Sequence, residues 1–110
     1  RDFVFVDDTV NALVAAAQAP GISGEIINVG SGVETTMNDL ITLMGEVVGA
    51  RPNVLHNTES TGGVQRLVAD IEKAARLLNY RPRTSLKDGL LRLYAEDPLF
   101  AGHAAAVAST

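Results

Sequence analysis

The sequence contains no cysteine and no tryptophan, and it has only two histidines. The lack of cysteine excludes disulfides, thiolate nucleophiles and zinc sites with cysteine ligands. His56 and His103 stand far apart and in no metal-ligand spacing, so we expect no metal site. No apolar run approaches the roughly 18 residues that a transmembrane helix needs, and no signal peptide is visible. We therefore expect a cytoplasmic protein without contact to a membrane.

The chain also lacks a dense basic stretch. It carries 9 Lys and Arg residues against 13 Asp and Glu residues, which gives a net charge of −4. The basic residues are spread through the second half, whereas nucleic-acid binding needs a clustered basic surface, so we expect no nucleic-acid partner. The 110 residues, of which 46% are hydrophobic and 20% charged, are typical of one small globular domain.

Hydrophobic periodicity predicts three short strands and four helices. The strands are expected at 3–6, 25–29 and 53–56, and the helices at 10–19, 37–48, 71–78 and 86–95. This alternating order favours an α/β fold, because strands and helices in alternation build a mostly parallel sheet. Three strands are too few for a complete doubly wound sheet, which suggests a piece of a larger protein. The Ala-rich residues 98–110 are expected to form a frayed or disordered tail.

Several local signals refine this prediction. Thr36 and Asp39 have the spacing of a capping box, and Gly49 is expected to end the same helix. In the first helix, the apolar residues from Val10 to Ala17 recur every three or four positions and predict an inward face. Asp7 and Asp8 precede that helix. We interpret them as caps and not as a catalytic carboxylate pair, which would have to face one cleft.

Four stretches in order carry a resemblance to a known family. They are RDFVFVDD at 1–8, NVGSG at 28–32, LVADIEKA at 67–74 and LLNYRPRTSLKDGL at 77–90. Together they resemble the C-terminal part of NAD-dependent nucleotide-sugar epimerases and dehydratases. These are extended short-chain dehydrogenases/reductases, and UDP-glucose 4-epimerase is one of them. The resemblance implies that residues 1–97 are the C-terminal substrate-binding region of an extended Rossmann-type enzyme, whose N-terminal Rossmann domain is missing here.

The family's catalytic and cofactor motifs do not occur in this sequence. The dinucleotide fingerprint needs a third glycine, which Gly30-Ser31-Gly32 lacks, so we favour a strand-to-loop turn there. The catalytic Tyr-x-x-x-Lys pair is also missing, because Thr84 follows Tyr80 and Pro98 follows Tyr94 at the lysine position. The resemblance thus implies that NAD is bound by other parts of a longer enzyme. We expect this chain to contain no catalytic residue.

Two arginines are the candidate substrate-binding residues. Arg1 matches the family arginine that contacts the substrate diphosphate, and a guanidinium suits this role because its planar fork pairs with two phosphate oxygens. The alternative is an arginine at a mobile chain end that binds nothing. Where the family often carries an Arg and an Asp, this chain has 60–63, Ser-Thr-Gly-Gly. Arg66 is the nearest basic residue and could replace the lost charge, or it could be solvated or ion-paired.

Two functions from different classes remain open. The chain could be the substrate side of a nucleotide-sugar epimerase or dehydratase, with the subfamily, the sugar and the base undetermined. Alternatively, it could be a non-catalytic binding or oligomerisation module derived from that family. Because the first helix and the 26–29 strand would normally pack against more sheet, we expect exposed apolar surface and a homo-oligomer.

Overall fold

A computed structural model describes residues 1–59 and 63–100. The chain divides into two compact units. Unit 1 consists of Arg1–Thr35 and Arg66–Leu86, and unit 2 of Thr36–Gln65 with the residues from Lys87 onward. Within the described parts, no helix is both long and apolar enough to cross a membrane.

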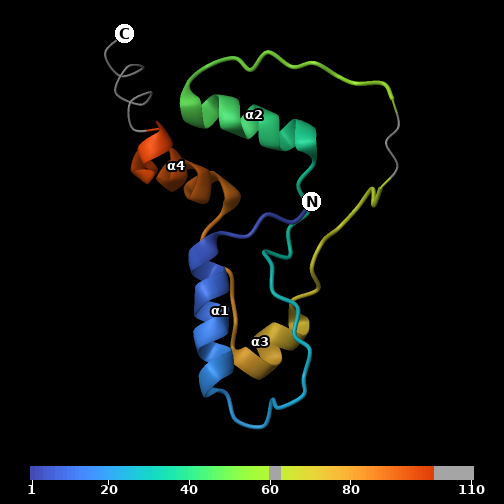
Figure 1. The fold of residues 1–110 in the computed structure, drawn as a ribbon, viewed down its shortest axis with the longest axis vertical. Coiled ribbons are helices and arrows are strands. Elements are labelled where there is room, and N and C mark those ends of the chain that lie inside the picture. Colours follow the sequence, from blue (N-terminus) through green and yellow to red (C-terminus); the bar gives the residue numbers. More distant parts are fainter. Residues whose placement is uncertain (60–62, 101–110) are drawn as a thin grey trace. The chain divides into compact units, whose positions relative to one another are not determined.

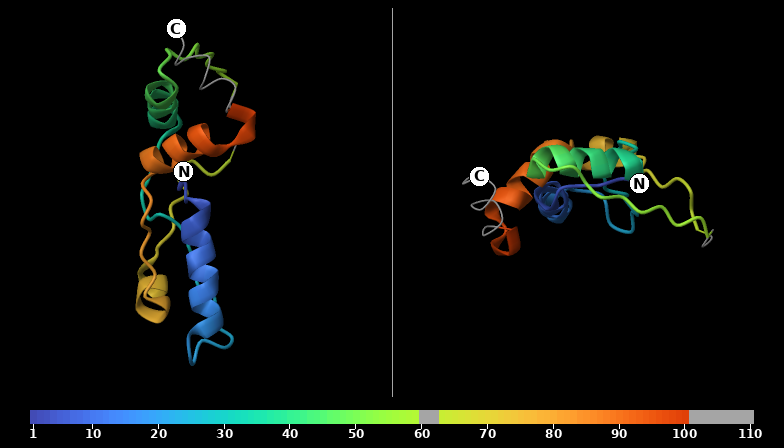
Figure 2. Two further views of the ribbon diagram at one scale, coloured as in Figure 1. Left: turned by 90° about the vertical axis from the view of Figure 1, so that its left-hand side faces the viewer. Right: turned by 90° about the horizontal axis from the view of Figure 1, so that it is seen from above.

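Unit 1 is built on two helices, α1 (Val6–Gln18) and α3 (Glu72–Leu78). Both figures show α3 beside the C-terminal half of α1 (Figures 1 and 2). The core lies between these helices and is small: Ala12, Ala74, Leu78 and Tyr80 are its buried members. Small alanines allow a close approach of the two helix backbones, and Ile27, Val29 and Ile71 pack around this core. Asn79 ends α3 in the left-handed conformation, as its position predicted.

Asp8 does not cap α1, contrary to the prediction. The helix begins one turn earlier than predicted, at Val6, and Phe5 occupies the capping position without a side-chain bond. Asp8 is 2% exposed and accepts hydrogen bonds from the backbone N–H groups of Arg83 (3.0 Å) and Thr84 (3.1 Å). Its carboxylate therefore joins α1 to the segment that follows α3. Such a contact between residues 75 positions apart cannot be inferred from local sequence.

The predicted inward face of α1 is in fact its outward face within unit 1. Val10, Leu13 and Val14 are all exposed, and Leu13 is 67% exposed. The opposite face carries Ala12 and Asp8 and packs against α3. We call Val6, Val10, Leu13 and Val14 the α1 stripe. Its exposure agrees with the expectation that this helix lacks an apolar partner.

Unit 2 contains α2 (Met37–Val48) and almost all of α4 (Leu86–Glu96). The predicted cap of α2 is confirmed, because Thr36 accepts a hydrogen bond from the N–H of Asp39 at 3.0 Å. Gly49 ends the helix in the left-handed conformation. An apolar cavity of about 70 Å³ lies between the two helices, lined by Met44, Val47, Val48, Leu90, Leu93, Tyr94 and Phe100.

The predicted strands do not form within residues 1–59 and 63–100. The segments at 3–5, 25–29 and 53–56 lack a β-ladder, and Ile26 is 83% exposed. A strand needs a neighbour for its backbone N–H and C=O groups, and no described segment supplies one in register. The α/β prediction thus holds for the four helices and fails for the strands. Of the predicted tail at 98–110, residues 98–100 are helical and 101–110 lie outside the described residues.

The two tyrosines provide a matched test of this packing. The Tyr80 hydroxyl is buried and donates to the carbonyl of Gly30 at 2.7 Å, whereas the buried Tyr94 hydroxyl has no partner among the described residues. Tyr80→Phe should lower the free energy of unfolding by about 1–3 kcal/mol, because it leaves a buried carbonyl unsatisfied. Tyr94→Phe should be neutral or stabilising. Urea denaturation followed by circular dichroism checks both, and equal effects would contradict this assignment.

Candidate functional site

The centre of unit 1 is the carboxylate of Asp2. Its Oδ1 accepts hydrogen bonds from the backbone N–H (2.8 Å) and the hydroxyl (2.6 Å) of Ser31. Its Oδ2 accepts from the N–H groups of Gly32 (3.0 Å) and Ala69 (3.1 Å). One side chain therefore joins the segment at residue 2, the Gly30–Gly32 turn and the segment leading into α3. The sequence identified Asp2 only as part of a motif, and its partners lie 29 to 67 residues away.

The four hydrogen bonds also determine the ionisation of Asp2. Partial burial on its own would raise the pKa of this carboxyl, because it disfavours the charged form. The bonds from Ser31, Ala69 and Gly32 outweigh burial, and the pKa of Asp2 lies below its ordinary value of 3.8. Asp2 is therefore a carboxylate at neutral pH. All its donors come from unit 1 itself, so the carboxylate is a shared hydrogen-bond acceptor that holds the turn.

Gly30 is required by close packing at this turn. A β-carbon at Gly30 would lie 2.7 Å from the β-carbon of Ala69 and 2.7 Å from Oδ2 of Asp2. Gly32 adopts φ +71°, the left-handed conformation that glycine favours. The two glycines of the Gly-Ser-Gly sequence thus bring the turn against Asp2 and Ala69. The predicted turn is thus confirmed, whereas the strand expected before it does not form.

The same turn does not fit a dinucleotide. Successive backbone N–H groups in such a turn form a concave anion site, which in dinucleotide-binding proteins faces a pyrophosphate. Here the N–H groups of Ser31 and Gly32 both donate to Asp2. A pyrophosphate would have to displace this carboxylate. The N–H groups of this turn are therefore already used within unit 1.

A cleft of about 530 Å³ opens beside Asp2. Its walls come from residues 1–4, 28–30 and 67–70, and Arg1 is the basic residue of this lining. The backbone of Arg1 is paired with Thr35 in both directions: its amino group donates to the Thr35 carbonyl at 2.8 Å, and the Thr35 N–H donates back at 2.9 Å. The structure thus places the first candidate residue at a cleft and anchors its main chain.

The second candidate, Arg66, forms an ion pair with Glu34. Its Nε donates to Oε1 of Glu34 at 2.7 Å, and a second guanidinium nitrogen donates to Oε2, which gives a two-point contact. This hydrogen bonding lowers the pKa of Glu34 and raises that of Arg66. The Arg66 side chain is 77% exposed, and Arg66 does not line the cleft, although Leu67 does. Because Glu34 and Thr35 are neighbours, both arginines are attached to the same short segment.

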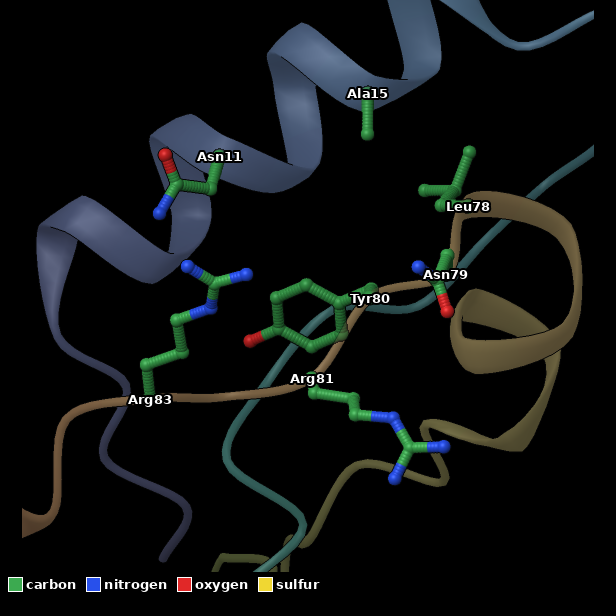
Figure 3. A pocket seen from close by; sticks show the side chains of 7 residues that line it. All are labelled: Asn11, Ala15, Leu78, Asn79, Tyr80, Arg81 and Arg83. Atoms are coloured by element: carbon green, nitrogen blue, oxygen red, sulfur yellow. The ribbon is translucent and has the colours of Figure 1, made fainter.

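A second cavity in unit 1, of about 260 Å³, also contains arginines (Figure 3). Arg83 extends towards α1 and Asn11, whereas Arg81 extends away from that helix. Because these two guanidinium groups extend in different directions, they are not arranged to bind one anion together. We therefore assign the candidate site to the Arg1 cleft.

Other sequence-based expectations can be followed only in part. Of the substituted stretch at 60–63, residues 60–62 lie outside the described residues. Among residues that are described, no group of three or more potential metal ligands occurs.

Comparison with known proteins relates the chain to nucleotide-sugar enzymes. No family model matches it. It is 36% identical over 92 residues to UDP-glucose 4-epimerase of Mycolicibacterium smegmatis, covering 84% of this chain and 29% of that protein. It is 37% identical over 95 residues to GDP-L-fucose synthase 1 of Arabidopsis thaliana, covering 86% of this chain and 28% of that protein.

Solved structures give the same relation. The chain superposes on UDP-glucose 4-epimerase of Thermotoga maritima, crystallised with UDP-glucose, with a TM-score of 0.75 and 34% identity over 83% of this chain. UDP-glucuronic acid 4-epimerase of Bacillus cereus, in complex with UDP-glucuronic acid and NAD, gives a TM-score of 0.69 and 38% identity over 82% of this chain. In both cases the chain spans 29% of the solved structure. These findings confirm the resemblance carried by the four sequence stretches.

Close packing at Gly30 leads to a stability prediction. Gly30→Ala should lower the free energy of unfolding by about 1–3 kcal/mol, because the new methyl group would overlap Ala69 and Asp2. Ala69→Gly in the same protein removes one of the two overlapping groups and should restore part of the loss. Denaturant unfolding of the single and double variants measures both effects. A Gly30→Ala protein as stable as the wild type would contradict the packing described above.

Proposed function

We propose that this chain, which is related over most of its length to the C-terminal part of UDP-glucose 4-epimerases and other nucleotide-sugar enzymes, forms the substrate side of such an enzyme. In this proposal the chain holds the diphosphate of a nucleotide sugar and supplies no catalytic group. NAD and the groups that do the chemistry belong to the remainder of the enzyme. The complete enzyme would be a cytoplasmic epimerase or dehydratase, whose sugar and nucleotide base are left open.

The single observation that carries the proposal is the position of Arg1. Arg1 lines the cleft of about 530 Å³ in unit 1, and its main chain is held by two hydrogen bonds to Thr35. The two carboxylates in the same lining are both engaged with backbone groups: Asp2 as above, and Asp70 with the N–H of Glu72 at 3.0 Å. Arg1 is the basic residue of this lining and is therefore the group that would attract an anion there, against the negative charge of the two carboxylates.

Arg66 is proposed as a secondary contact to the same diphosphate. Arg66 is exposed, and its guanidinium already binds the two oxygens of a carboxylate, in the two-point manner in which a guanidinium also binds two oxygens of a phosphate. Exchange of Glu34 for a phosphate would conserve the hydrogen bonds of Arg66. An exposed ion pair contributes little stability, so its loss would cost little.

The proposal also accounts for the exposed apolar surface of unit 1. The α1 stripe and Ile26 would be covered in the complete enzyme by the N-terminal Rossmann domain that the family resemblance implies. The same domain would offer neighbours to the extended segments at 3–5 and 25–29, which have none among the described residues.

Arginine substitutions in the complete enzyme test the proposal. Arg1→Ala should weaken the binding of UDP-glucose, or of the nucleotide sugar that the enzyme prefers, by about tenfold or more, because it removes a charge-assisted contact. Arg66→Ala should have a smaller effect in the same direction. Isothermal titration calorimetry measures both, and Arg51→Ala, an exposed arginine of unit 2, is the control for net charge. Unchanged affinity in Arg1→Ala would refute the proposed role of the cleft.

A second candidate function rests on the α1 stripe. If the chain acts alone, a second copy is the simplest cover for four neighbouring exposed apolar residues, and the chain would be a homo-oligomerising module.

Self-association of the 110-residue chain tests this second candidate. Light scattering should then show a dimer or larger species, and Leu13→Gln should shift it towards the monomer because Leu13 is central in the stripe. Ser23→Gln, at an exposed polar position outside the stripe, should leave the association unchanged. A monomer at high concentration would count against the module.

A further inference from the structure

We infer that Asp2 is a positioning residue for nucleotide-sugar binding: its carboxylate joins the cleft wall at 67–70 to the turn that follows the wall at 28–30, and thereby sets where Arg1 meets the diphosphate. This inference rests on the proposed function of the Arg1 cleft. It assigns a role to a side chain that the sequence motif alone leaves without one.

The walls of the cleft are held together by hydrogen bonds to this carboxylate. Asp2 directly follows Arg1, and its Oδ2 accepts from the N–H of Ala69 in the wall at 67–70. The bonds from Ser31 and Gly32 secure the turn next to the wall at 28–30. Asp2 thus bonds directly to the wall at 67–70 and to the turn that follows the wall at 28–30. On the far side of Arg1, the backbone pairing with Thr35 completes its anchoring.

A carboxylate is the side chain that satisfies this arrangement. Each oxygen of Asp2 accepts two hydrogen bonds. Asparagine accepts only at its single oxygen. With that oxygen at the Oδ2 position, its NH2 group would face the N–H of Ser31, which would lose its acceptor, and the Ser31 hydroxyl would have to turn and accept. With the amide reversed, the N–H groups of Gly32 and Ala69 would both lose their acceptor.

The same geometry argues against a direct chemical role for Asp2. A general base must reach the proton that it abstracts, with lone pairs available for it. The oxygens of Asp2 already accept hydrogen bonds from four donors of unit 1. Burial raises the pKa of the carboxyl, but these bonds outweigh burial and lower the pKa below its ordinary value. Asp2 is therefore argued to act through Arg1 and the cleft walls.

The test is a double-mutant cycle in the complete enzyme, with UDP-glucose as the probe and calorimetry as the readout. Asp2→Asn should weaken binding by about tenfold, and Arg1→Ala should weaken it far less in the Asp2→Asn background than in the wild type. Asp8→Asn is the matched control, since Asp8 also holds two backbone N–H groups in unit 1 but does not line the cleft. The folded Asp8→Asn protein should bind UDP-glucose normally, and the effect of Arg1→Ala on affinity should be the same in this background as in the wild type.

The pH dependence of binding is an independent readout. UDP-glucose keeps the charge of its diphosphate when the solution is acidified moderately. Because the folded-state pKa of Asp2 is lowered, the carboxylate and its bonds persist above that pKa and are lost as the pH falls through it. The wild-type affinity should fall as the pH drops through the lowered pKa of Asp2, below 3.8, whereas the already weakened affinity of Asp2→Asn should not follow the same titration.

The outcomes separate the inference from the proposed function. If Arg1→Ala weakens binding and Asp2→Asn does not, or if the two effects add independently, the positioning role of Asp2 is wrong while the site stands. If the wild type binds no nucleotide sugar, the proposed function itself fails. Should Asp2→Asn not fold, Ser31→Ala removes the 2.6 Å bond to Asp2 and the hydroxyl's contacts to Val33, and it keeps the other three bonds of the carboxylate. A two- to threefold loss of affinity, non-additive with Arg1→Ala, supports the inference, and unchanged affinity overturns it.

Discussion

Unit 1 depends on one carboxylate that is shared by three distant segments. Burial of a charged group is costly, and Asp2 is retained because four donors replace the water that it gives up. The two glycines of the turn follow from this contact, since a side chain at Gly30 would collide with Asp2 itself. Asp8 repeats the principle on the other side of α1, where it secures the segment after α3. A unit with a core of only four buried apolar residues thus relies on polar bonds over long sequence separations.

This construction forms a cleft in a unit whose described residues contain no β-sheet. The carboxylate of Asp2 lies between the cleft walls, and Arg1 is held at the cleft by its pairing with Thr35. The anion-binding N–H groups of the turn are already used within the chain. A bound diphosphate would therefore depend on guanidinium groups, which agrees with a substrate-side role and with the absence of a cofactor fingerprint in the sequence.

Local signals predicted the local structure well. The Thr36 cap, the left-handed Gly49 and Asn79, and the four helices are confirmed because each depends on residues within a few positions. The strands, the inward face of α1 and the role of Asp8 were predicted wrongly, since each depends on a partner far away in the chain or outside the described residues. The arginines were identified through a family resemblance, whereas their contacts to Thr35 and Glu34 required the structure. Asp2 shows the limit most clearly, because its motif is visible and its four partners are not.

Whether the Arg1 cleft receives the diphosphate of a nucleotide sugar is best decided by a crystal structure of the complete enzyme with UDP bound. We expect a phosphate oxygen within hydrogen-bond distance of the Arg1 guanidinium, with Asp2 still bonded to Ser31, Gly32 and Ala69. A diphosphate bound elsewhere, with the cleft free of ligand, would contradict it.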